Sequence, residues 1–286
     1  MSNNGMKSLL KENKLRTRKR FGQNFINDEM LLDRIVDTAQ ISLDDQVLEI
    51  GPGMGTLTQK LCDSAKKVVS VEIDRDLVKY LNKEVVSKNS NLTIVEGDFL
   101  KFKLKSFIEE YFDNGPIKVV ANIPYYITTP IILMLLDMHD CFENIVLMVQ
   151  DEVADRLEST PGKKAYGSLT IAVNYKAFVN KAFIVEASYF TPPPKINSAI
   201  IVLKPHNRYR ELQIDEEMLF KIVKKAFSVR RKTMVNALCK DGSFNKEVVR
   251  ECLDIQGLSQ NIRGEALSLE EYMEFTINYI KISKNK

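Results

Sequence analysis

The tetrapeptide Asn122-Ile123-Pro124-Tyr125 offers the most specific chemistry in this sequence. The side-chain oxygen of Asn122 and the backbone carbonyl of Ile123 or Pro124 can accept hydrogen bonds from an amino group. Two such acceptors would draw the lone pair of an aromatic amine out of conjugation, so that the nitrogen can attack a methyl donor. Pro124 would fix the turn, and Tyr125 would offer a ring face for stacking a base. The loop therefore predicts amine methylation that depends on positioning and desolvation, without a strong general base.

A glycine-rich turn and two acidic residues indicate where the methyl donor binds. The turn Gly51-Pro52-Gly53-Met54-Gly55 directly follows an apolar run that is typical of a buried strand. Glu72 ends the second strand and would accept hydrogen bonds from ribose hydroxyls, and Asp98 follows the third strand and would bind an adenine amino edge. The glycine spacing is G-x-G-x-G, whereas the dinucleotide motif is G-x-G-x-x-G and supports a pyrophosphate. These residues predict S-adenosylmethionine, which has no phosphate, with a nicotinamide cofactor as the alternative.

An aromatic residue in the second half of the chain could complete a clamp for the base. Phe190 precedes the rigid, extended segment Thr191-Pro192-Pro193-Pro194-Lys195. That segment could hold the Phe190 ring over the face of a base opposite Tyr125. A position in the hydrophobic core is the alternative for this ring.

Apolar runs that alternate with helical patterns would bring these loops to one edge of a sheet. Buried strands are predicted at 47–50, 68–71, 92–95, 117–121 and 145–149. Helices are predicted at 30–39, 56–64, 74–87 and 130–138. This alternation is typical of an α/β domain with a doubly wound, Rossmann-like parallel sheet, in which ligands bind at the carboxyl ends of the strands.

The second half of the chain changes from strands to helices. After an acidic helix at 152–157, apolar runs at 169–173, 182–185 and 199–203 are expected to extend the sheet with antiparallel strands. Beyond Pro205 the predicted helices lie near 215–228, 230–239, 245–253 and 268–280. We therefore expect a basic flexible tail (1–20), a methyl-donor-binding domain (21–205) and a small all-helical C-terminal domain (206–286).

The distribution of charge points to a polyanionic partner. The net charge is only +3, but seven basic residues lie between Lys7 and Arg20, and no acid interrupts the basic segment from Met218 to Lys240. Such segments favour RNA binding, although solvated surface is the alternative. The scattered cysteines predict neither disulfides nor a metal site, and no apolar run is long enough to span a membrane. We expect a cytoplasmic protein.

Four segments together resemble the ribosomal RNA adenine N6,N6-dimethyltransferase family: Phe21–Phe25, Glu49–Gly55, Asn122–Tyr125 and Phe190–Ser198. The segments 150–157, 166–168 and 227–238 are most similar to its small-subunit branch. The resemblance implies a class I methyltransferase sheet and S-adenosylmethionine as the cofactor. It also implies dimethylation of N6 on two adjacent adenines in a hairpin near the 3′ end of 16S rRNA. The partner would be the immature small ribosomal subunit, and loss of such enzymes gives kasugamycin resistance.

The resemblance also implies roles for individual residues. Catalysis would rest on Asn122, Pro124, Tyr125 and Phe190. The cofactor would be held by Asn24 and Ile26 near its methionine end, by Gly51, by Glu72 at the ribose, by Asp98 at the adenine and by Asn122 beside the methyl group. RNA phosphates would be bound by Arg230, Arg231 and Lys232. No metal is implied, and we expect a monomer.

Three other functions remain open from the sequence. The related large-subunit rRNA dimethylases, which confer macrolide resistance, use the same chemistry on a different RNA. A ribosome assembly factor could dock by the basic surfaces, with methyl transfer incidental to its role. A nicotinamide oxidoreductase could use the same glycine-rich turn.

Overall fold

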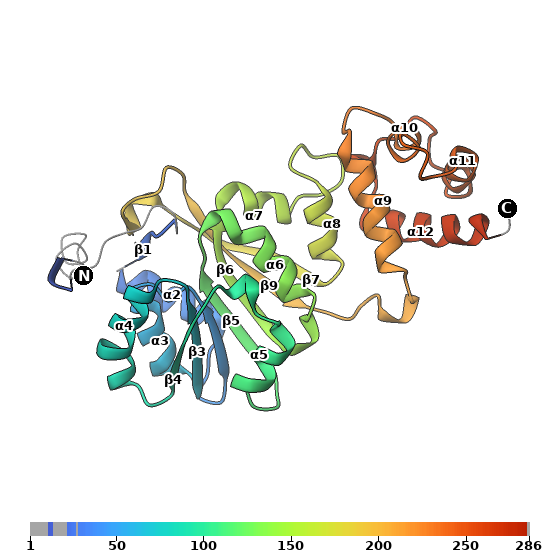
Figure 1. The fold of residues 1–286 in the computed structure, drawn as a ribbon. Coiled ribbons are helices and arrows are strands. Elements are labelled where there is room, and N and C mark those ends of the chain that lie inside the picture. The colour runs from blue at the N-terminus through green and yellow to red at the C-terminus, as the bar shows by residue number, and fades with distance from the viewer. Residues whose placement is uncertain (1–10, 14–21, 27, 285–286) are drawn as a thin grey trace. The chain divides into compact units, whose positions relative to one another are not determined.

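The computed structural model describes residues 11–13, 22–26 and 28–284 (Figure 1). Most of the predicted basic tail (1–20) and Phe21 of the first family segment lie outside the described residues. The chain divides into two compact units, one made of residues 1–154 and 177–206 and the other of residues 155–176 and 207–286. The second unit thus takes a segment from the middle of the chain as well as the helical C-terminal part.

A sheet of seven strands in the order β4-β3-β2-β5-β6-β9-β7 is the centre of the first unit. Its strands are β2 (Gln46–Ile50), β3 (Lys67–Glu72), β4 (Leu92–Glu96), β5 (Ile117–Asn122), β6 (Phe142–Gln150), β7 (Ala177–Val185) and β9 (Ser198–Pro205). The first five are parallel, whereas β9 pairs antiparallel with both β6 and β7. The five predicted parallel strands are therefore confirmed, as are the antiparallel strands predicted at 182–185 and 199–203. The strand β2 lies between β3 and β5 in the sheet, and all five of its residues are buried, as expected for a central parallel strand.

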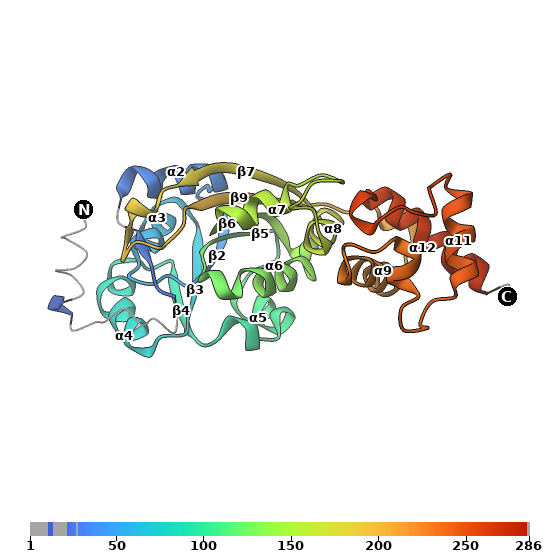
Figure 2. The same cartoon turned by 90° about the horizontal axis from the view of Figure 1, so that it is seen from above.

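Helices connect the parallel strands and cover both faces of the sheet. They are α2 (Glu29–Ala39), α3 (Thr56–Ser64), α4 (Arg75–Glu84), α5 (Leu104–Tyr111) and α6 (Thr128–Leu136). Figure 2 shows α2 and α3 on one face and α5 and α6 on the other. Asp28 begins α2 by accepting a hydrogen bond from the Leu31 amide at 2.8 Å. A two-stranded sheet of β1 (Phe25–Ile26) and β8 (Phe190–Thr191) joins distant parts of the chain.

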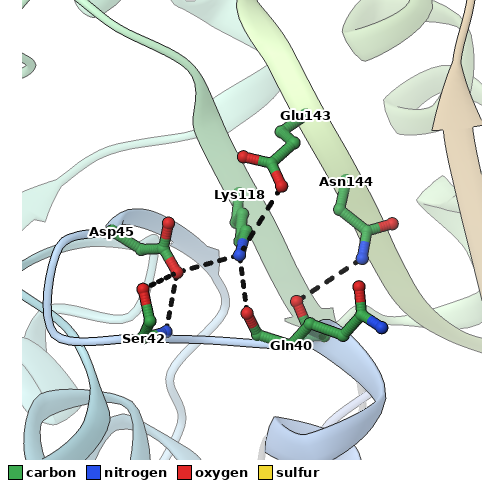
Figure 3. Close-up of polar contacts among 7 residues, drawn as sticks. Gln40, Ser42, Asp45, Lys118, Glu143 and Asn144 are labelled. Atoms are coloured by element: carbon green, nitrogen blue, oxygen red, sulfur yellow. Dashed lines mark hydrogen bonds and ion pairs between the residues drawn. The ribbon is translucent and has the colours of Figure 1, made fainter.

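A buried lysine at the start of β5 fixes the end of α2 to the sheet (Figure 3). Lys118 Nζ donates to the Gln40 carbonyl at 2.6 Å and to the Asp45 carboxylate at 2.8 Å, and Glu143 lies 3.7 Å away. Burial opposes ionisation of Asp45, but hydrogen bonds from Lys118 and Ser42 outweigh it and hold the pKa of Asp45 below its usual value. The opposite end of the same strand carries the predicted catalytic loop.

One predicted strand is wrong. The apolar run 169–173 forms the helix α8 (Ser168–Asn174), which follows α7 (Asp151–Leu157) and belongs to the second unit. A short apolar run does not distinguish a strand from a buried helix by periodicity alone. In the structure Thr170 Oγ1 donates to the Arg156 carbonyl and Asn174 Nδ2 donates to the Leu157 carbonyl, and these bonds tie α8 to the end of α7.

The C-terminal part of the second unit is helical, as predicted. Its helices are α9 (Glu216–Ser228), α10 (Met234–Leu238), α11 (Lys246–Ile255) and α12 (Leu269–Ser283). The helix predicted at 230–239 starts later, because a turn occupies 229–232 and Thr233 caps α10 through the Asn236 amide. Within the described residues, none of the helices combines the length and apolar character needed to cross a bilayer.

Candidate active site at the carboxyl edge of the sheet

A cavity of about 360 Å³ lies at the carboxyl ends of β2, β3 and β5. This volume is in the range of small-molecule sites. The structure brings every predicted cofactor residue to its wall: Asn24, Ile26, Gly51, Glu72, Asp98 and Asn122. Pro124 and Tyr125 of the predicted catalytic loop also line it. Across residues 11–13, 22–26 and 28–284, no three His, Cys, Asp or Glu side chains gather closely enough to hold a metal ion.

The glycine-rich turn fits tightly between the pocket and the helices. Gly51 has a φ of 74°. A Cβ built at this position would have only the Asn122 carbonyl near it, at 3.8 Å, so there is open space beside the backbone at the pocket wall. Gly55 has a φ of 76° and a different reason to be glycine. A Cβ on Gly55 would come within 2.8 Å of Leu81 and 2.9 Å of Val85. The third glycine of the motif therefore serves packing against α4.

Glu72 lies at the end of β3 with its carboxylate on the pocket wall. One oxygen accepts from the Gly53 amide at 3.2 Å and the other from the Asp74 amide at 2.8 Å. Burial raises the pKa of Glu72 to about 7, and the two backbone hydrogen bonds oppose that rise. The carboxylate is thus oriented before any ligand arrives, and its charge changes close to neutral pH.

Glu49 is a pocket residue to which the sequence analysis gave no role of its own. Its side chain is buried in β2, and Ser70 Oγ donates to one carboxylate oxygen at 2.6 Å. The other oxygen, Oε1, has no hydrogen-bond partner among the described residues. Burial raises the pKa of Glu49 to about 7, and the neighbouring Ser70 and Thr58 hydroxyls oppose this rise. The signal in the sequence was a single acidic residue inside an otherwise apolar strand.

The segment before α2 is fastened across the pocket by three polar contacts. Gln23 Nε2 donates to Asp74 at 3.2 Å, and Thr56 Oγ1 donates to the Ile26 carbonyl at 2.7 Å. Asn122 Nδ2 donates to the Asn24 carbonyl at 3.2 Å. These contacts explain how Asn24 and Ile26 reach the site although they precede the sheet.

The catalytic loop presents one fixed amide and two aromatic rings to the pocket. Because Asn122 Nδ2 faces Asn24, its Oδ1 is left as an acceptor, and none of the described residues donates to it. The Tyr125 hydroxyl is 2.7 Å from Ser198 Oγ, which anchors the ring to the start of β9. Tyr126 also lines the pocket and is 62% exposed, yet the sequence analysis gave it no role. The only indication of a role for Tyr126 in the sequence was that it is a second tyrosine directly after the tetrapeptide Asn122–Tyr125.

Asp98 lies on the pocket wall in a short turn after β4. Its Oδ1 accepts from the Leu100 amide at 3.2 Å and so caps the turn at 99–101. Lys101 lies 3.8 Å from the other carboxylate oxygen. The carboxylate is therefore held near the pocket, at the place expected for an adenine-binding acceptor.

Two predicted site residues are not among those that line the cavity. Phe190 is only 1% exposed, pairs with Ile26 across β8 and β1, and packs in the core of the first unit. The structure therefore places this ring beneath the surface and Ser198, from the same family segment, beside Tyr125. Arg230, in the second unit, donates from Nη2 to the carbonyls of Lys164 and Tyr166. That guanidinium makes hydrogen bonds within the protein although its side chain is 44% exposed, and Arg231 and Lys232 are exposed as well.

Comparison with known protein families gives one match over nearly the whole chain. Residues 14–280 match the model of the ribosomal RNA adenine dimethylase family. A ribosomal RNA small subunit methyltransferase A from Lachnoclostridium phytofermentans is 45% identical over 256 residues, which cover 89% of this chain and 88% of that protein. The protein of the same name from Streptococcus pneumoniae is 43% identical over 272 residues, 93% of each chain.

Solved structures show the same fold. A dimethyladenosine transferase from Plasmodium falciparum superposes with a TM-score of 0.77 at 29% identity, covering 91% of this chain and 98% of that one. The 23S rRNA methyltransferase ErmE superposes with a TM-score of 0.65 at 26% identity, covering 90% of this chain and all of the other. The relatives named for the small subunit are thus more similar in sequence to this chain than the 23S rRNA enzyme is.

Proposed function

The chain belongs to the ribosomal RNA adenine dimethylase family, and on that premise we propose that it dimethylates N6 of two adjacent adenines near the 3′ end of 16S rRNA. The identity to small-subunit relatives, 45% against 26% for the 23S enzyme, supports this substrate. The substrate is the hairpin as it occurs in the immature small subunit, and the protein acts on it as a cytoplasmic monomer. The observation that carries the proposal is Asn122, fixed on the wall of the pocket with a free amide oxygen.

The pocket suits S-adenosylmethionine by the chemistry of its groups. Hydrogen-bond acceptors from Glu72 and Asp98 match the ribose hydroxyls and the adenine amino group that they would meet. Glu49 is a further buried carboxyl group among the residues that line the pocket. Gly51 leaves room for a ligand to approach the backbone. When bound, the cofactor supplies an electrophilic methyl group on a sulfonium.

The residues of the loop can activate the adenine amino group. Asn122 Oδ1 accepts one amino hydrogen, and the carbonyl of Ile123 or Pro124 accepts the other. The Pro124 carbonyl already accepts from the Ile127 amide at 3.1 Å, so that it has one lone pair left. With both hydrogens bound, the N6 lone pair leaves conjugation and points at the carbon it attacks. The nitrogen takes the methyl group as the carbon–sulfur bond of the sulfonium breaks, and the methylated nitrogen then releases a proton to water. For the second methyl group N6 carries a single hydrogen, so only one of the two acceptors is used.

Stacking holds the base while these bonds form. Tyr125 is braced by Ser198, so its ring offers a fixed face at the loop. Because Phe190 is buried, the exposed ring of Tyr126 is the second aromatic surface at the mouth of the pocket. Alignment of this kind contributes about 7 to 11 kcal/mol to lowering a barrier, which is more than general base catalysis usually supplies.

The test is methylation of defined RNA substrates. Purified protein is incubated with labelled S-adenosylmethionine and either small-subunit particles that lack the modification or naked 23S rRNA, and nucleosides are analysed by mass spectrometry. We expect N6,N6-dimethyladenosine at two adjacent positions of 16S rRNA. Product in 23S rRNA alone would assign the large-subunit activity. An absence of product in both RNAs would support the assembly factor.

A further inference from the structure

Tyr126 is a large aromatic side chain that the structure leaves exposed beside the catalytic loop. It lines the cavity directly after Tyr125, and 62% of its surface is accessible. The other aromatic rings on the cavity wall, in the part of the chain that the structure describes, are the buried Phe25 and Phe99 and the partly buried Tyr125. An exposed aromatic ring of this kind gains free energy when another flat apolar group covers it.

The backbone around Tyr126 gives the ring a defined place. A Cβ added to Gly22 would lie 3.7 Å from two atoms of the Tyr126 ring and 3.4 Å from Pro124. Gly22 has a φ of 57°, which glycine adopts without strain, so the segment before α2 can pass close to the ring. The turn that carries the ring is closed by a hydrogen bond of 3.1 Å from the Ile127 amide to the Pro124 carbonyl. The ring therefore stands at the mouth of the cavity with most of its surface uncovered.

The proposed substrate contains two adjacent adenines, but the loop offers acceptors for one amino group. Asn122 Oδ1 can bind the amino group of only one base at a time. A base that leaves its stack to enter the site also deprives its neighbour of a stacking partner, and this unstacking costs free energy. One phosphodiester joins the two bases, so the neighbour has to lie within one nucleotide of Tyr125. Tyr126 is the next residue of the chain, with its Cα about 3.8 Å from that of Tyr125.

We propose that Tyr126 binds the adenine next to the one that is being methylated, by stacking against it. The inference rests on the proposed function and adds a second base site beside the catalytic one. Stacking depends on the flat face of a base and not on its hydrogen-bonding edge, so the ring can hold a methylated or an unmethylated adenine. Tyr125 then contacts the reacting base, and Tyr126 contacts the base that waits.

The test is a cycle in which the ring and the waiting base are removed separately and together. Binding of the full-length protein to small-subunit particles is measured with S-adenosylhomocysteine present, so that no methyl group is transferred. The particles carry 16S rRNA with both unmethylated adenines, or with one or the other replaced by a nucleotide that lacks a base. We expect Tyr126→Ala to weaken binding to intact particles about 5- to 20-fold, which is typical of the loss of one base–aromatic stack. On particles that lack the waiting base, the same substitution should cost less than about twofold.

Two further variants separate stacking from other effects of the substitution. Tyr126→Phe keeps the ring and should bind every particle within about twofold of the wild-type affinity. Phe178→Ala is the matched control, because Phe178 is 53% exposed and does not line the cavity. Its affinity for intact particles should equal that of the wild type.

The outcomes distinguish this inference from the proposed function. If the wild-type protein does not bind small-subunit particles, the proposed function fails. If it binds, the inference is overturned by wild-type affinity in Tyr126→Ala, or by an equal loss on the intact particles and on both kinds that lack a base. If Tyr126→Ala does not fold, the wild-type protein decides alone, because equal affinity for all three particles also overturns the inference.

Discussion

Cofactor binding should depend on pH through Glu72. Burial raises the pKa of this carboxyl from 4.5 to about 7 in the ligand-free protein. An ionised carboxylate accepts hydrogen bonds from ribose hydroxyls more strongly than the neutral acid does. Affinity should therefore rise as the pH increases through 7 and level off above 8.

The size of the effect follows from the fraction of ionised protein. With a pKa of about 7, Glu72 is about one-tenth ionised at pH 6 and about nine-tenths ionised at pH 8. If the ionised form is the competent one, the apparent dissociation constant should be about tenfold higher at pH 6 than at pH 8. The same shift has a consequence for the ligand-free protein. Because the folded-state pKa is raised, the stability contributed by the neutral acid is present below pH 4.5 and is lost as the pH rises towards 7.

The assay is titration calorimetry with S-adenosylhomocysteine, which avoids turnover. Glu72→Gln is the control, because Gln keeps the shape of the side chain and cannot ionise. Ionisation of groups on the ligand affects binding to both proteins alike, so the ratio of the two affinities isolates the contribution of Glu72. That ratio should change about tenfold between pH 6 and pH 8. A constant ratio would refute the assignment of Glu72 to the ribose.

Three further predictions concern stability. Gly55→Ala should lower the free energy of unfolding by about 3 kcal/mol, because the strain of a positive φ adds to the overlap of the new methyl group with side chains at the end of α4. The control is Gly257→Ala, which has a φ of 65° but open space around it and should cost about 1 kcal/mol. Equal losses in denaturant titrations would contradict the packing role of Gly55. Lys118→Met should cost about 3 kcal/mol, because the Gln40 carbonyl loses its donor and the Asp45 carboxylate, still bonded by Ser42, loses its cation. Lys60→Met, at a more exposed ion pair, should cost less than about 1 kcal/mol. Phe190→Ala should lower the free energy of unfolding, measured by thermal unfolding, by about 3 to 5 kcal/mol. Phe190→Leu should keep both stability and methylation activity. A stable but inactive Phe190→Leu would instead support the predicted role of Phe190 in clamping the base.

Much of the architecture could be predicted because parallel strands leave a strong local pattern. The run at 47–50 is apolar except for Glu49, and it stands before the glycine-rich turn, so strand, turn and ligand edge followed together. The run at 169–173 has the same apolar character but becomes a helix. In the structure this segment is tied to α7 by hydrogen bonds from Thr170 and Asn174 to residues 14 and 17 positions earlier, and such partners are not visible in a local pattern.

The site shows the same division between local and long-range information. Asn122 was identified from its own tetrapeptide, yet its amide is oriented by the hydrogen bond that it donates to the Asn24 carbonyl, 98 positions earlier. Phe190 and Arg230 were assigned by residue type to a base and to phosphates. Their surroundings lie far away in sequence, since Phe190 pairs with Ile26, and Arg230 donates to carbonyls 64 and 66 positions earlier. Residue type indicated the chemistry available, and only the fold determines which partner uses it.

The central claim is that Asn122 activates the adenine amino group. The most direct test measures the rate of methyl transfer by Asn122→Ala to small-subunit particles under single-turnover conditions. Removal of one oriented hydrogen-bonding group from an active site costs about 100- to 1000-fold in rate. We expect a loss of at least that size, with affinity for S-adenosylhomocysteine largely retained. A variant that binds the ligand and transfers methyl groups at the wild-type rate would contradict the account.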